Sequence, residues 1–98
     1  MATQTDSASR RRQMQLIGLR IVQARARRGM TQSDLAAEIG RSRRAIGRWE
    51  SGDRMCSIID CIAIAEGLSC PIGELVSGIG GVPPASAHPS TAGDRRRR

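Results

Sequence analysis

The chain has 98 residues, 16 of them basic and 9 acidic, which gives a net charge of +7. Every basic residue is an arginine, and this excess favours an anionic partner. The length allows one small domain. Because Trp49 is the only Trp, Tyr or Phe, its core must be aliphatic, which favours helices over a β-sandwich.

The cysteines and the single histidine do not form a metal-binding pattern. Cys56, Cys61 and Cys70 are odd in number and contain no C-x-x-C pair, and His88 lies far downstream. We expect no metal, no cofactor and no disulfide framework, with the cysteines as buried or half-buried thiols rather than a redox site. Without an apolar run of transmembrane length or a secretory signal, the sequence predicts a cytoplasmic protein with no membrane partner.

The two ends differ in composition from the interior. Residues 1–13 are mostly Thr, Ser, Gln and Ala followed by arginines, and residues 77–98 are rich in Pro, Gly and Ser and end in an arginine run. We expect a flexible basic arm over 1–13, a folded domain over 14–76 and a disordered tail over 77–98.

Capping signals and glycines divide the interior into helices. The first is predicted from Met14 to Arg28. The second begins at Thr31, which fits a capping box with Asp34, and the third follows the N-cap candidate Ser42.

The third helix is predicted to reach Glu50 before Gly52 stops it, and two further helices follow. The fourth opens with a box at Ser57 and Asp60, and the fifth spans Pro71 to Val76. The prediction is an all-α domain of five short helices.

The third helix has two unlike faces on a period of about 3.6 residues. One carries Ala45, Ile46 and Trp49, and the other carries Arg44, Gly47 and Arg48, with Arg43 at its edge. We expect Trp49 to pack in the core. Glycine inside a helix is about 1 kcal/mol less favourable than alanine, so Gly47 needs a reason: either it lets this helix seat closely against its partner, or it is harmless variation.

A helix, a short turn with Gly40 and a second amphipathic helix form a helix-turn-helix arrangement. The stretch "TQSDLAAEIGRSRRAIGRWESGDR" resembles the Cro and phage-repressor type helix-turn-helix, also called the XRE family. The matching places are Thr31, Gln32, Leu35, Ala36, Gly40, Ile46, Glu50 and Gly52, and the likeness extends over residues 16–76. The resemblance implies a compact lambda-repressor-like DNA-binding domain.

The resemblance also implies a set of DNA contacts. Residues matching Arg43, Arg44 and Arg48 touch base edges in similar proteins, and an arginine fork suits guanine O6 and N7. Those matching Gln32, Ser42 and Ser51 touch phosphates, and we add Arg41 and Arg54 to this predicted set. Alternatively, Gln32 is only a solvated residue in the first turn.

Arg25 continues the stripe of Ile17 and Ile21, and Glu50 follows Ile46 by one helical step, so each charge lies on a face otherwise meant for burial. The resemblance implies that Arg25 and Glu50 pair and orient the third helix. The alternative is a surface pair between Glu50 and Arg54.

These features predict a sequence-specific transcriptional regulator, a repressor, that binds double-stranded DNA as a homodimer and is nucleoid-associated when bound. The alternative is an antitoxin-like or other protein-interaction module that binds a partner protein. No catalytic set is recognisable, so we predict no enzyme. Arg10, Arg11 and Arg12 serve either as a DNA-contacting arm or as a solubilising tail.

Overall fold

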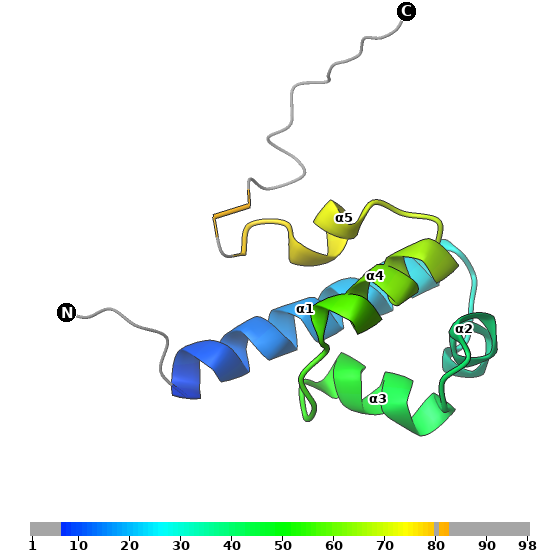
Figure 1. Ribbon diagram of the computed structural model, residues 1–98, viewed down its shortest axis with the longest axis horizontal. Coiled ribbons are helices and arrows are strands. Elements are labelled where there is room, and N and C mark those ends of the chain that lie inside the picture. Colours follow the sequence, from blue (N-terminus) through cyan, green and yellow to red (C-terminus); the bar gives the residue numbers. More distant parts are fainter. Residues whose placement is uncertain (1–6, 80, 83–98) are drawn as a thin grey trace, which may run out of the picture.

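A computed structural model describes residues 7–79, 81 and 82, and within them the chain forms helices and no strand (Figure 1). The helices are α1 (Ser7–Arg27), α2 (Gln32–Ile39), α3 (Arg43–Ser51), α4 (Ile58–Gly67) and α5 (Ile72–Val76). The predicted all-α class with five helices is confirmed for this part of the chain.

The first helix begins earlier than the sequence predicted. α1 starts at Ser7 rather than Met14, so residues 7–13, assigned above to a flexible arm, are helical. This stretch lacks Gly and Pro and contains good helix formers, and extending a helix that already exists is easier than nucleating one. The rest of the predicted arm, residues 1–6, lies outside the described residues.

Local capping sets the ends of the two central helices. Thr31 Oγ1 accepts a hydrogen bond from Asp34 N (3.0 Å), and Asp34 Oδ2 accepts one from Thr31 N (2.9 Å). Ser42 Oγ likewise accepts from Ala45 N (3.0 Å) at the start of α3. Gly40 and Gly52 end α2 and α3 with φ of 73° and 80°, the left-handed region that glycine adopts most readily. The predicted starts and stops are confirmed here.

The segment after α5 is more ordered than predicted where the structure describes it. Gly78 N donates to Val82 O (2.9 Å), which closes a turn, and Arg20 Nη1 in α1 donates to Ser77 O (2.9 Å). The domain therefore extends past Val76, because contacts with α1 hold residues whose composition resembles a tail. Residues 83–98, including the terminal arginine run, lie outside the described residues.

One aliphatic core with a single indole joins the helices. All five helices, and the residue that follows α4, contribute its fully buried side chains, which are Ile21, Leu35, Ile46, Trp49, Ile64, Leu68 and Leu75. α1 packs against α3 and α5, and α2 packs against α3 and α4. In Figure 1, α3 lies along one edge of the molecule and α5 lies across α1 from it. The core therefore holds α3 by one face and leaves its other face at the surface.

At Gly18, α1 lies directly against the backbone of α3. A Cβ atom there would lie 2.4 Å from Glu50 O and 2.5 Å from Trp49 O, which no real side chain tolerates. Glycine is needed at this position because the α3 backbone occupies the space of a side chain. This contact fixes the C-terminal end of α3 against α1.

Candidate nucleic-acid interface

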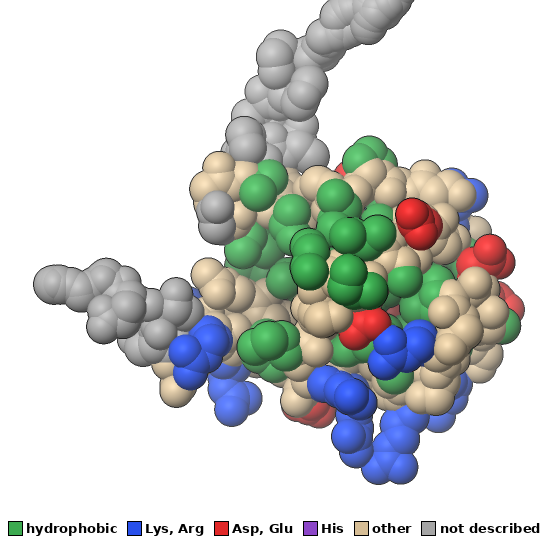
Figure 2. All heavy atoms as spheres, in the orientation of Figure 1, with side chains coloured by type: hydrophobic (Ala, Val, Ile, Leu, Met, Phe, Trp, Pro, Cys, Tyr) green, Lys and Arg blue, Asp and Glu red, His purple; other side chains and the backbone are tan. Residues whose placement is uncertain are grey.

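The helix α3 separates its apolar and basic side chains as its sequence predicts. Ala45, Ile46 and Trp49 are buried, and Arg43, Arg44 and Arg48 are exposed. Figure 2 shows basic side chains gathered along the edge of the molecule where α3 lies. This basic edge is the candidate nucleic-acid interface.

The three exposed arginines differ in what they contact. Arg43 Nη1 donates to Gln32 Oε1 of α2 (3.1 Å). Within the described residues, the guanidinium groups of Arg44 and Arg48 have no hydrogen-bond or ion-pair partner. Their donors are therefore available to an external acceptor, whereas Arg43 is already oriented by α2.

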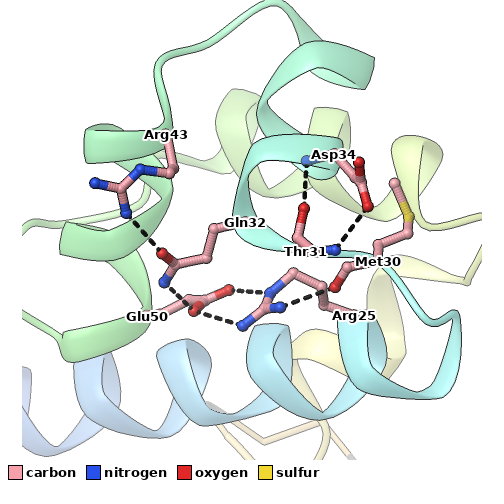
Figure 3. A network of polar contacts seen from close by, with 7 residues as sticks. All are labelled: Arg25, Met30, Thr31, Gln32, Asp34, Arg43 and Glu50. Carbon is pink, nitrogen blue, oxygen red and sulfur yellow. Dashed lines mark hydrogen bonds and ion pairs between the residues drawn. The ribbon is translucent and has the colours of Figure 1, made fainter.

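A bidentate ion pair joins α1 to the end of α3 (Figure 3). Arg25 Nε donates to Glu50 Oε2 (2.7 Å), and Arg25 Nη2 donates to Glu50 Oε1 (3.1 Å). Arg25 Nη1 also donates to Met30 O (2.8 Å), ahead of α2. The side chains are 18% and 6% exposed, so the pair is largely withdrawn from water. Glu50 thus pairs with Arg25, and the surface alternative with Arg54 is not what the structure contains.

The electrostatics of this pair favour its charged form. The Glu50 carboxylate accepts hydrogen bonds from the Arg25 guanidinium, which raises the pKa of Arg25 above its already high ordinary value. Arginine is therefore protonated at every pH where the domain is of interest. The pair links α1 to α3 through a guanidinium that keeps its charge.

Gln32 connects the ion pair to the basic edge. Its Nε2 donates to Glu50 Oε1 (2.8 Å), and its Oε1 accepts from Arg43 (3.1 Å). Figure 3 shows these contacts as one chain of polar side chains from Arg25 to Arg43. Gln32 is half-buried, and both its amide nitrogen and its amide oxygen already form hydrogen bonds. Its contact with a phosphate stays a prediction and would have to use this same amide.

Arg41, in the turn before α3, is held by two contacts. Arg41 Nη1 pairs with Asp60 Oδ1 at the start of α4. Its guanidinium carbon lies 4.9 Å from the centroid of the Trp49 ring, within cation–π distance. The sequence predicts only a phosphate contact for Arg41. Its contact with Asp60 could not be predicted, because nothing in the sequence indicates that α4 begins beside this turn. The structure gives it a packing role, and its phosphate contact stays a prediction.

The predicted serine contacts coincide with capping groups. Ser42 caps α3, and Ser51 Oγ donates to Arg48 O (3.1 Å) and accepts from Asp53 N (3.4 Å). Both serines and Arg54 are exposed. They flank α3 at its two ends, and their contacts with phosphate stay predictions.

Gly47 lies on the exposed side of α3 without a packing reason for glycine. A Cβ atom added there would find only Gln32 Nε2 within 4 Å, at 3.8 Å, an ordinary contact. The fold itself therefore accepts alanine at this position, and the reason for glycine must lie in a partner or in neutral variation.

The described part of the chain offers neither a metal-binding cluster nor a membrane-spanning helix. No cluster of three or more His, Cys, Asp or Glu side chains there could hold a metal ion. None of its helices is long and apolar enough to cross a membrane.

Comparison with known proteins places this geometry in a family. A family model described as "Helix-turn-helix" matches residues 21–75, which is more than half of the chain. The chain therefore belongs to the helix-turn-helix family, of the Cro/C1 type that the sequence resembles, and is a DNA-binding transcription regulator.

Among solved structures, the chain is similar to the restriction-modification controller protein C.AhdI from Aeromonas hydrophila. The two are 29% identical with a TM-score of 0.62, and the match covers 63% of this chain and 94% of that one. No curated protein sequence matches.

Proposed function

We propose that this protein is a sequence-specific repressor that reads the major groove of double-stranded DNA with α3 and has no enzymatic activity. The proposal rests on two exposed arginines of the basic edge whose guanidinium groups are unused. Arg44 and Arg48 are exposed and unpartnered among the described residues, on a helix that the Arg25–Glu50 pair links to α1. A fixed helix with unused guanidinium groups suits base recognition, because base contacts require a defined position.

Guanine is the base that these arginines fit best. Two parallel N–H donors of a guanidinium match the O6 and N7 acceptors at the guanine edge in the major groove. Arg43 is positioned by Gln32 and would read or clamp beside them. Ser42, Ser51, Arg41, Arg54 and Gln32 would contact phosphates and set the register.

The test is to select bound fragments from random duplex DNA and then measure variants on the selected site and on a scrambled duplex. Arg44→Ala and Arg48→Ala should each weaken specific binding by about 1–3 kcal/mol and relax one base position in each half-site. Arg27→Ala is the control, since it also removes one charge but its guanidinium faces Glu74 of α5. Equal losses on both duplexes would show that Arg44 and Arg48 are not base readers.

We further propose that the protein binds DNA as a homodimer through α4. Met55, Ile58, Ile59 and Ile62 are exposed large apolar side chains on or next to this helix, and Ile59 is 70% exposed. Figure 2 shows hydrophobic side chains gathered over the face formed by α4 and α5, away from the basic edge of α3. A twofold contact there would bury an apolar surface and leave both α3 helices uncovered.

The dimer proposal predicts that Ile59→Asp makes the protein monomeric in sedimentation and weakens binding to a palindromic site. Leu19→Asp is the matched control, because Leu19 is exposed on the side of α1 opposite the buried Ile21. The interaction-module alternative would be favoured by a different result. In that case the wild-type protein stays monomeric, selects no DNA site and binds a stable protein partner through the same isoleucines.

A further inference from the structure

Two thiols meet at the start of α4, outside the basic edge. Cys56 precedes the N-cap Ser57, and Cys61 follows four residues after that cap. Their sulfur atoms lie 3.2 Å apart, and Cys61 Sγ also lies 3.7 Å from Cys56 O. Sulfur atoms in a disulfide lie about 2.05 Å apart, so bond formation needs an approach of only ~1.2 Å.

The helix cap explains why these thiols are together. Ser57 Oγ accepts a hydrogen bond from Asp60 N (3.1 Å), which fixes the first turn. The residue before an N-cap and the fourth residue after it commonly pack on each other as an apolar staple. Cys56 and Cys61 occupy these two places, so the capped backbone itself holds them in contact.

One of the two thiols can be reached from solvent. Cys61 is buried, but Cys56 is half-buried and lines an open hollow of about 370 Å³ between α1 and the segment that follows α3. Arg10 and Arg54 also line this hollow. The positive charge of Arg54 favours small anionic reagents at Cys56.

The thiols also differ in acidity. The hydrogen bond between the Cys61 and Cys56 sulfurs lowers the pKa of Cys61. The same contact, together with burial, raises the pKa of Cys56. The pair thus combines an accessible sulfur with a more acidic neighbouring thiol, and the thiolate is the form that reacts in thiol–disulfide exchange.

We propose that Cys56 and Cys61 are an oxidisable dithiol, which a small anionic disulfide converts into an intramolecular disulfide across the start of α4. Cys56 loses its proton to solvent and its thiolate attacks the reagent, and the first small thiolate leaves. Cys61 then gives its proton through solvent to that thiolate and attacks the Cys56 sulfur, which releases the second small thiolate. The protein dithiol loses two electrons and the reagent gains them.

The experiment treats dilute full-length protein with oxidised glutathione, quenches with acid, alkylates the remaining thiols and measures the intact mass. Cleavage before aspartate then separates Cys56, between Asp53 and Asp60, from Cys61 and Cys70. The expected product is a monomer that has lost two thiols per chain, in which the peptide with Cys56 is joined to the peptide with Cys61 and Cys70. Cys70→Ser should form the same link, because Cys70 has no cysteine partner in the structure.

The variants make the result decisive. In Cys61→Ala the reaction should stop at a glutathione adduct on Cys56. Cys56→Ser leaves the buried Cys61 thiol unaltered and should form neither the disulfide link nor the adduct. Arg54→Gln should slow oxidation by glutathione disulfide about threefold, the effect of one unit charge at roughly 7 Å in water, and leave an uncharged hydroxyethyl disulfide unaffected.

Three free thiols after treatment would overturn the proposal. Disulfides found only between separate chains would also overturn it. So would a disulfide that still forms in Cys61→Ala but is lost in Cys70→Ser, because it would use Cys70 in place of Cys61. Equal slowing of both reagents by Arg54→Gln would remove the anionic specificity. None of these readouts involves DNA, so they are independent of the proposed repressor function.

Discussion

The ion pair between Arg25 and Glu50 should contribute more to stability than an ordinary surface pair. Glu50 is 6% exposed and accepts three hydrogen bonds, from Arg25 Nε (2.7 Å), Arg25 Nη2 (3.1 Å) and Gln32 Nε2 (2.8 Å). Arg25→Ala removes two of these and leaves a buried carboxylate with one donor. Glu50→Ala leaves a guanidinium that is 18% exposed and still donates to Met30 O (2.8 Å).

We expect each substitution to lower the free energy of unfolding by about 3–5 kcal/mol, because each leaves one buried charge without its partner. Arg25→Ala should be the more damaging, since Glu50 is the less exposed member. A domain of this size has a total stability of roughly 4–11 kcal/mol, so Glu50→Gln, which keeps the side-chain shape, serves as a milder variant if an alanine variant does not fold.

The assay is a double-mutant cycle by urea unfolding, followed by circular dichroism. The double variant should lose clearly less than the sum of the single losses, because it leaves no unpaired charge. The chain supplies its own control in Arg27 and Glu74, which also join α1 to another helix but are 61% and 39% exposed. Breaking that pair should cost no more than about 1 kcal/mol. If the Arg25 and Glu50 losses are additive, or no larger than those of the control pair, the structural role is refuted.

Three further predictions concern glycines and the C-terminal segment. Gly18→Ala should destabilise the domain strongly in thermal unfolding, because its Cβ would overlap the α3 backbone at 2.4 Å; an unchanged melting temperature would contradict this packing. Gly47→Ala should instead stabilise it by about 1 kcal/mol, and a simultaneous loss of specific DNA affinity would show that glycine permits close approach to a base pair. Deleting residues 83–98 should preserve the helical spectrum and the preferred site while the dependence of log affinity on log salt becomes shallower, whereas an altered site would show that these residues read bases.

The parts of the fold that were predictable are those fixed by local chemistry. Thr31, Ser42 and Ser57 cap the helices that follow them, since a capping hydrogen bond depends only on residues three positions apart. Gly40 and Gly52 end helices for an equally local reason, the left-handed φ. Such local signals are enough to predict the helix-turn-helix without any tertiary contact.

What the sequence did not reveal depends on contacts between distant segments. The order of Ser77 comes from Arg20, and the need for glycine at position 18 comes from the α3 backbone. In the candidate site, Gln32 was recognised as important, but its bridge between Glu50 and Arg43 requires the relative placement of three helices. Such contacts leave no periodic signal in one sequence.

The separation of α3 into a fixed and an unused face has an evolutionary consequence. Ile46 and Trp49 cannot change freely because the core depends on them, whereas the guanidinium groups of Arg44 and Arg48 have no hydrogen-bond or ion-pair partner in the described part of the chain. Substitutions at these two exposed positions can therefore accumulate without loss of folding. If α3 reads DNA as proposed, related proteins can diverge to new operators through a few surface codons while inheriting the same scaffold.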